Sequence, residues 1–394
     1  MTDAEDRILP LDVARGAAVI GVVLMNVAAI MLPRAVAIFP SLGAAPGMAS
    51  LPDALVWLAG FVIVDGKARA LLAMLFGASS LLVIDRAEMD GRDGMDAQRR
   101  RLLWLLPIGL AHYALLWSGD ILMLLAVDGL IALRFAAGEP LDLLKTAFLF
   151  FAVQLAIAIM LAVATYVTTS TAAYDALLQR EMVLDIAMHR DGYLPLLMQR
   201  VMDLPHAATM LAVHALPETL GFMMLGMAMA KGGFFTGQWS ADQYRSTAVR
   251  ALLISIPPTL ALGLWAMTTQ DSRSLDMIGY AASFPFRIPL AIGEAALLVL
   301  LSESGARMWI VRAMAAAGRL AMTNYLLCSL IITSLAYGYG AGLYAHPGRV
   351  ALLGIALALI AAMLIWSPLW LARVGRGPAE RLWHRLQRIG ARAG

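Results

Sequence analysis

Charged side chains are scarce in this sequence. Only 14% of its 394 residues are Asp, Glu, Lys or Arg, whereas 61% are hydrophobic. A soluble domain of ordinary composition carries about twice that charged fraction. The shortage excludes an ordinary soluble enzyme, and apolar runs long enough to cross a bilayer recur from end to end. The composition therefore predicts an all-α fold, a polytopic transmembrane helical bundle with the lipid bilayer as its first partner.

Cysteine and a basic N-terminal segment are also lacking. The single cysteine, Cys328, excludes an intramolecular disulfide and a cysteine-rich metal site, and we expect no metal. The N-terminus, MTDAEDR, is acidic, so we expect no cleaved signal peptide. The stretch KGGFFTG lacks the Lys-Ser/Thr ending of a phosphate loop. We accordingly expect neither a nucleotide loop nor a nucleic-acid partner.

The apolar runs predict about ten spans within one integral domain, 1–394. It divides into an N-terminal half (1–169), an external segment (170–206) and a C-terminal half (207–394). We place the spans at 9–32, 66–85, 102–118, 120–136, 146–169, 207–230, 250–268, 284–302, 320–337 and 350–371.

The apolar stretch at 51–64, LPDALVWLAGFVIV, is short for a span, and we predict a re-entrant or interfacial helix that leads into the second span. With ten spans and both termini cytoplasmic, twenty of the 30 Lys and Arg residues lie inside. Nine lie outside, and Arg15 lies within the first span. This distribution follows the positive-inside rule. A full span at 51–64 would reverse every later segment and place the Arg-rich C-terminus outside.

The longest segment predicted outside is 170–206. In YDALLQREMVLDIAMHRDGYLPLLMQRVMD the apolar residues recur at helical spacing between charged ones. This pattern predicts amphipathic helices that lie on the outer face of the membrane.

Ionisable residues gather in the outer half of the predicted membrane region, where a buried charge is costly and by default suggests function. Their convergence predicts an outward-facing polar cavity. The alternative is that they pair between helices or extend to the interface. The set comprises Asp65, Lys67, Arg69, His112, Asp120, His214, Glu218 and Arg287.

The stretch HYALLWSGD either belongs to a functional site or forms only the turn between two helices. Ser118 and Gly119 predict a turn, with Ser118 capping the helix that Asp120 opens. His112 lies deeper, where it serves either as a base, acid or donor, or as a histidine bonded to a neighbouring backbone.

His214 and Glu218 are four residues apart and would share one helix face. They form either an oriented base or a structural pair at a kink caused by Pro217. Toward the inner side, Asp12 and Arg15 are three apart and can pair. Arg319 and Asn324 either hold an anionic cytoplasmic ligand or anchor helix ends.

Six motifs then carry a resemblance, in order and over nearly the whole chain. LDVARG, DGKARALLAMLFG, HYALLWSGDIL, LPETLGFMMLGM, GRLAMTNYLLCSLI and SPLW…GPAERLW resemble the YeiB family of bacterial inner-membrane proteins. That family carries a C-terminal domain of unknown function and is labelled transport-associated. The resemblance implies a multi-pass protein of the bacterial inner membrane.

The YeiB family is in turn distantly similar to membrane-bound acyltransferases, the group of the heparan glucosaminide acetyltransferase and the bacterial surface-sugar O-acyltransferases. Those enzymes move an acyl group from cytoplasmic acyl-CoA to a sugar across the membrane. The surface-sugar enzymes carry an arginine and, after ten residues, a histidine; here Arg15 is followed at that spacing by Asn26. Asparagine cannot act as a general base.

The preferred hypothesis is an acyltransferase-like protein that uses acyl-CoA as co-substrate and an extracytoplasmic glycan or lipid as acceptor. His112 would be the base, Asp120 would orient it, and His214 and Glu218 would assist. The acceptor would be held by Asp65, Lys67, Arg69, Ser118 and Arg287, and the inner vestibule would be lined by Asp12, Arg15, Asn26, Arg319 and Asn324.

Two alternatives remain open. A transporter of a small anionic or lipidic substrate would use the same cavity, with Asp128 or Glu294 as a proton-coupling carboxylate. A non-catalytic membrane partner protein would pair its polar residues among themselves and leave no cavity. The sequence leaves homo-oligomer formation open.

Overall fold

A computed structural model describes residues 9–38, 50–269 and 271–389. Within these ranges the chain is helical and contains no strand, which confirms the predicted all-α bundle. The α-helices are α1 (Leu9–Met31), α2 (Arg34–Ile38), α3 (Leu51–Ile63), α4 (Lys67–Met89), α5 (Gly94–Leu115), α6 (Leu122–Ala132), α7 (Pro140–Thr168), α8 (Thr171–Arg190), α9 (Tyr193–Met202), α10 (Leu204–His214), α11 (Leu216–Lys231), α12 (Ala241–Thr268), α13 (Ser272–Asp276), α14 (Phe284–Ser304), α15 (Trp309–Arg319), α16 (Ala321–Ala336), α17 (Arg349–Arg373) and α18 (Pro378–Ile389). Short 3-10 helices lie at Leu133–Phe135 and Phe234–Thr236, and a π-helical turn lies at Met277–Ala282.

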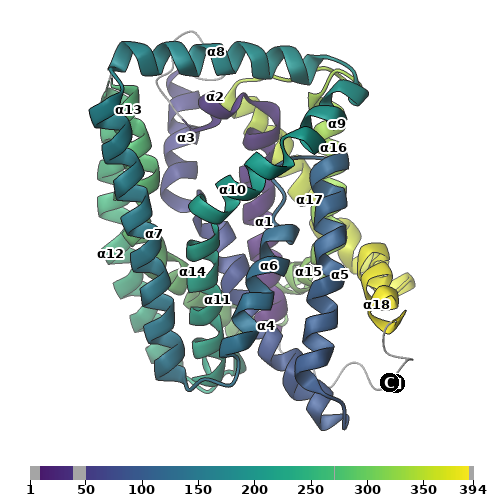
Figure 1. The fold of residues 1–394 in the computed structure, drawn as a ribbon. Helices are drawn as coiled ribbons and strands as arrows, with labels where there is room; N and C mark the ends of the chain where they lie inside the picture. The colour runs from purple at the N-terminus through teal and green to yellow at the C-terminus, as the bar shows by residue number, and fades with distance from the viewer. Residues whose placement is uncertain (1–8, 39–49, 270, 390–394) are drawn as a thin grey trace.

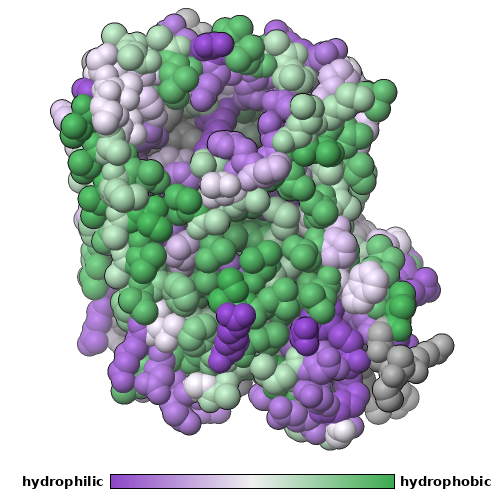
Figure 2. All heavy atoms as spheres, in the orientation of Figure 1, coloured by the Kyte–Doolittle hydropathy of each residue, from purple (hydrophilic) through white to green (hydrophobic). Residues whose placement is uncertain are grey.

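Six of the described helical stretches are long and apolar enough to cross a membrane, and the number rises to eight if each of two bent pairs is one span. The bent pairs are α10 with α11, at 52°, and α15 with α16, at 84°. Figure 2 shows the matching surface, a hydrophobic belt with hydrophilic residues gathered at the lower end and around a hollow near the upper end. The chain is therefore a membrane protein with multiple spans.

The predicted count of ten also includes α5 and α6. The helix α6 has 11 residues, which at 1.5 Å per residue covers only about half of a hydrocarbon core. For these two helices, crossing the membrane stays a prediction.

The helix predicted at 51–64 is present as α3. It has 13 residues, and together with α4 it forms one apolar stretch of 39 residues, Leu51–Met89. The break between the two is a turn at Gly66, whose φ of 77° lies in the left-handed region that favours glycine. The helix α3 thus leads into α4 and adds no separate crossing.

Glycines bring α4 and α11 into backbone contact. A Cβ added at Gly77 would lie 2.2 Å from the Met223 carbonyl oxygen, and one at Gly226 would lie 1.8 Å from that of Met74. Small residues allow this close crossing of helices in membranes. Arg69 precedes Gly77 by as many residues as Glu218 precedes Gly226, so the crossing brings these two side chains to one level.

The external amphipathic segment predicted at 170–206 is confirmed as helices that lie outside the spans. Figure 1 shows α8 running across one end of the bundle, with α9 descending from it. We call this the α8 end, and the charge distribution predicts that it faces outside. Apolar side chains of α8 pack against the bundle, and a polar contact adds to them: Tyr344 donates a 2.8 Å hydrogen bond to Asp185 Oδ2, and His189 Nδ1 lies 2.9 Å from Asp185 Oδ1.

This contact makes the attachment of α8 sensitive to acid. Burial alone would raise the pKa of Asp185, but hydrogen bonds from His189, Tyr344 and the Arg34 amide outweigh it and lower the pKa below its ordinary value. A lowered folded-state pKa gives stability that is complete above the unfolded value of about 3.9 and is lost as the pH falls through the folded one.

We therefore expect the backbone amides of α8 to exchange hydrogen faster, relative to those of α17, when the pH falls below about 4. The measurement is hydrogen exchange of the detergent-solubilised protein, corrected for intrinsic rates. In Asp185→Asn the α8 amides should be less protected at neutral pH and lose this added acid sensitivity. An unchanged pH response in the variant would contradict the assignment to Asp185.

Candidate functional site

Two cavities approach each other inside the bundle. The larger, about 910 Å³, lies toward the α8 end between α1, α3 and α17, with the starts of α4 and α14 on its rim. The smaller, about 170 Å³, lies toward the opposite end between α1, α4, α5, α16 and α18. We call them the large cavity and the small pocket. The volume of the large cavity is at the upper end of the range for small-molecule sites, whereas that of the small pocket is below it.

A buried carboxylate between two arginines stands at the edge of the large cavity. Glu218, in the first turn of α11, accepts hydrogen bonds from Arg69 Nη2 at 2.6 Å and from Arg287 Nη1 at 3.2 Å. Arg69 and Arg287 line the cavity, and Glu218 lies behind them with 4% of its side chain exposed. Two guanidinium charges meet one carboxylate, so this corner keeps one net positive charge.

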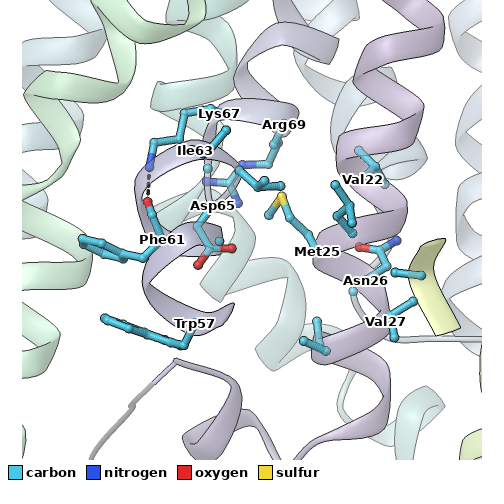
Figure 3. Close-up of a pocket in the computed structure, with 18 of the residues that line it drawn as sticks. Val22, Met25, Asn26, Val27, Trp57, Phe61, Ile63, Asp65, Lys67 and Arg69 are labelled. Atoms are coloured by element: carbon cyan, nitrogen blue, oxygen red, sulfur yellow. Dashed lines mark hydrogen bonds between the residues drawn. The ribbon is translucent and has the colours of Figure 1, made fainter. Parts of the chain in front are cut away.

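The turn between α3 and α4 supplies a second polar group to the cavity. The Lys67 ammonium donates to the carbonyl oxygen of Phe61, near the end of α3, as the dashed line in Figure 3 shows. This contact satisfies one of the carbonyl groups that a helix end leaves free. Asp65 lines the cavity, and its charged neighbours include Lys67 and Arg349. Of the predicted acceptor-binding residues, four line the large cavity: Asp65, Lys67, Arg69 and Arg287.

His112 and Asp120 are in contact at the inner end of the large cavity. His112 Nδ1 lies 2.8 Å from Asp120 Oδ1, at ion-pair distance but off the direction of a hydrogen bond, and neither side chain is exposed. Asp120 lines the large cavity, whereas His112 lines neither cavity. The base predicted at His112 is therefore one layer removed from the space that a substrate would occupy, whereas Asp120 borders that space with its carboxylate buried.

Tyr325 of α16 separates the two cavities. It lines both of them, as do Val22 and Ile121. The backbone N–H of Ile121 donates to the Tyr325 hydroxyl at 3.4 Å, and the His112 ring lies 4.8 Å from the Tyr325 ring. A wall one side chain thick thus divides a cavity at the α8 end from a pocket at the opposite end, with His112 and Asp120 beside it.

Ser118 does not cap the following helix, contrary to the prediction. Asp120 does so, because its Oδ2 accepts a 2.6 Å hydrogen bond from the backbone N–H of Met123. Ser118 lines neither cavity. The sequence WSGD contains two residues that can cap a helix, Ser118 and Asp120. The buried Asp120 is the one that does so.

The predicted pairing of His214 with Glu218 is wrong. The helix breaks at Ala215 and bends by 52°, so positions four apart no longer share a face. Pro217, in the first turn of α11, favours a helix start there. His214 packs against Tyr280 with ring centroids 5.8 Å apart, and no hydrogen bond or ion pair joins it to Glu218 in the described structure.

The residues predicted for an inner vestibule separate into three groups. Arg15 and Arg319 line the small pocket, and Arg15 also donates to Asp12 and to Ser79 at 3.0 and 2.9 Å. Asn26 lines the large cavity instead, and Figure 3 shows it on the α1 wall.

Asn324 belongs to neither cavity. Its amide donates to the Ala317 carbonyl and to Ser367, and it accepts from Trp366. These bonds tie α16 to α15 and α17, so the helix-anchoring alternative fits this residue.

Asp128 and Glu294, the carboxylates considered for proton coupling, line neither cavity. Both carboxylate oxygens of Asp128 are buried without a hydrogen-bond partner in the described structure. Glu294 is a charged neighbour of Lys67.

Sequence reasoning missed Arg349 and the aromatic residues of the large cavity. Arg349 opens α17, lines the cavity and donates to the Val36 carbonyl at 2.6 Å. In the sequence analysis, Arg349 was only one of the nine basic residues assigned to the outer side of the membrane. Trp57 and Phe61 of α3 stack with ring centroids 5.1 Å apart, and their spacing of four along the sequence was the available signal.

Comparison with known proteins gives relatives without an assigned activity. Residues 229–390 match a family model described as "Protein of unknown function (DUF418)". The chain is 30% identical over 387 residues to "Uncharacterized protein YeiB" of Escherichia coli K12, covering 97% of this chain and 96% of that protein. It is 26% identical over 395 residues to "Uncharacterized protein YxaH" of Bacillus subtilis 168, covering 97% and 94%. No solved structure matches.

Proposed function

The chain belongs to the YeiB family, and the relatives named above have no assigned activity. From its two cavities we propose a function: transfer of an acyl group across the membrane. The donor is acyl-CoA approaching the small pocket, and the acceptor is a glycan or lipid hydroxyl in the large cavity. One observation carries the proposal. A wall of three side chains separates the two cavities, and a buried histidine–carboxylate pair lies against it.

The reaction balances with residues at this wall. The acceptor oxygen attacks the thioester carbonyl, and its proton passes to the Asp120 carboxylate. The carbon–sulfur bond then breaks, and the CoA thiolate takes the proton back. His112 acts on Asp120 rather than on the acceptor, because it stands behind the carboxylate and holds its position. We correct the initial hypothesis accordingly, with Asp120 as the base and His112 as a positioning residue.

The small pocket supports the donor side only in part. Arg15 and Arg319 bring positive charge toward the end where a cytoplasmic anion would arrive, but Glu380 lines the same pocket and Arg15 is paired with Asp12. A volume of about 170 Å³ admits the acyl end of the donor and excludes its nucleotide. The proposal therefore requires the Tyr325 side chain to turn aside during transfer, so that thioester and acceptor meet.

The test is acyl transfer from labelled acetyl-CoA by the purified full-length protein in bilayer discs of total bacterial lipid. We expect label on a lipid or glycan acceptor with the wild type, and a loss of about 10²-fold or more in His112→Ala. The pH–rate profile of His112→Gln should also change, which a merely structural role would not produce. Arg245→Gln, whose side chain is 69% exposed and lines neither cavity, is the matched control.

A well-folded protein that transfers no label would overturn the enzyme proposal. A cavity open at one end and closed by a thin wall also suits a transporter. Uptake of labelled anions or lipids would then become the decisive assay. The partner-protein alternative predicts no cavity, and the 910 Å³ space argues against it.

A further inference from the structure

We propose that the large cavity binds a membrane lipid that carries a phosphate group. The phosphate contacts Arg69 and Arg287, and the lipid chain follows the apolar wall. This inference deepens the proposed function, because it names the class of the acceptor. Its evidence is independent of any acyl donor, and so is its test.

The proposed phosphate position is supported by guanidinium N–H groups of Arg69 and Arg287 that have no hydrogen-bond partner in the described structure. They lie at a corner of net positive charge. A guanidinium has five N–H donors. Arg69 uses one on Glu218 and is about one-third exposed, at 30% of its side chain. Arg287 uses its two terminal nitrogens on Glu218, Gly279 and Ser283, and its Nε is buried without a partner. Arginine pairs of this kind match the geometry of a phosphate, which accepts several hydrogen bonds at once.

Apart from the corner formed by Arg69, Arg287 and Glu218, the charged residues around the cavity do not add up to a net positive charge. Lys67 and Arg349 face three carboxylates, Asp65, Asp53 and Glu294, of which only Asp65 lines the cavity. Asp120 is paired with His112. The corner between Arg69 and Arg287 is thus where an added anion is favoured.

The proposed position of the lipid chain is supported by apolar side chains that line the cavity and are exposed. Leu55 and Ile63 of α3 line it and are 52% and 57% exposed. Met25 of α1 and Leu353 of α17 complete the wall, and Figure 3 shows Met25 facing α3 and α4 across the cavity. A soluble anion such as phosphate alone would leave this apolar surface in water, whereas a lipid chain covers it.

The entrance also favours a lipid. Figure 2 shows the side of the molecule hollowed between α8 and α10, below the helix that crosses the end of the bundle. Leu211 of α10 and Ala215 beside it line the large cavity, so the α10 segment borders both the cavity and this hollow. If α8 lies on the membrane surface, the hollow opens sideways at the level of the lipid headgroups. A lipid can enter there without leaving the bilayer.

A glycine of the cavity wall offers a test that spares the fold. A Cβ at Gly60 of α3 would meet no atom within 4 Å, and Gly60 lines the cavity. The Cβ of a leucine there enters open space, its side chain narrows the cavity, and the substitution improves helix propensity. Gly354 of α17 also has open space at its Cβ but does not line the cavity, so Gly354→Leu is the matched control.

Binding is measured by native mass spectrometry of the full chain in detergent. The probes are dioleoyl phosphatidic acid, uncharged dioleoylglycerol and soluble glycerol 3-phosphate. We expect the wild type and Gly354→Leu to bind phosphatidic acid, and Gly60→Leu to bind it about tenfold or more weakly. Arg69→Gln should lose about tenfold, and the exposed control Arg245→Gln should lose nothing.

Three results would overturn the proposal. Equal binding of phosphatidic acid and dioleoylglycerol would show a site that ignores phosphate. Competition by glycerol 3-phosphate at the same concentration as the lipid would indicate a soluble phosphate ligand. Undiminished binding in Gly60→Leu would place the lipid elsewhere on the surface. Because no acyl-CoA is present, acyl transfer can fail while this binding is found, and the two proposals fail separately.

Discussion

Replacing Glu218 with alanine is expected to lower the free energy of unfolding by about 3–5 kcal/mol. The carboxylate stands between Arg69 and Arg287, at 2.6 and 3.2 Å, and only 12% of the Arg287 side chain is exposed. Removing it leaves two close guanidinium charges without a counter-charge, and the cost of burying an unpaired charge exceeds that of losing a pair. Equilibrium unfolding in mixed detergent micelles measures the change.

The matched control is Glu88→Ala. Glu88 lies exposed in the last turn of α4 and makes no side-chain hydrogen bond or ion pair in the described structure. Its loss should change the free energy of unfolding by no more than about 0.5 kcal/mol. A similarly small effect of Glu218→Ala would mean that the two arginines do not depend on this carboxylate.

The same variant connects stability to the proposed lipid. A phosphate placed between Arg69 and Arg287 would supply the negative charge that Glu218→Ala lacks. Phosphatidic acid should therefore stabilise Glu218→Ala more than it stabilises the wild type, and dioleoylglycerol should stabilise neither. Equal stabilisation of both proteins by phosphatidic acid would separate the binding site from this charge cluster.

The sequence predicted the fold class and the outer polar residues well, because both depend on the cost of charge in an apolar medium. Long uncharged runs must be spans, and the ionisable residues among them must find partners or a cavity. Asp65, Lys67, Arg69 and Arg287 meet at one cavity on that ground alone. The amphipathic spacing of 170–206 likewise required only a surface to lie on.

Predictions that depended on the local course of the backbone were less reliable. Pairing His214 with Glu218 assumed a continuous helix, but the chain bends at Ala215. Ser118 and Asp120 were both good caps by residue type, and only burial decided between them. Asn26 was grouped with Arg15 because the spacing of the two matches an arginine and a histidine of the surface-sugar O-acyltransferases, yet they are about 16 Å apart along the helix axis and line different cavities.

Replacing Asp120 with asparagine is expected to lower acyl transfer about 10²- to 10⁴-fold while leaving the fold nearly unchanged. Asp120 has two roles that this substitution separates. Oδ2 caps α6 through the Met123 amide, and asparagine caps a helix about as well as aspartate. Oδ1 lies 2.8 Å from His112, and this role needs the negative charge that asparagine lacks.

Transfer of labelled acetyl-CoA and the thermal midpoint of unfolding are measured on the same preparation. Asp120→Ala removes both the cap and the charge, so it should match Asp120→Asn in activity and be less stable by about 1 kcal/mol or more. If Asp120→Asn retains full transfer, the carboxylate does not take the proton. The base must then be sought among other groups at the wall, beginning with the Tyr325 hydroxyl, which lines both cavities.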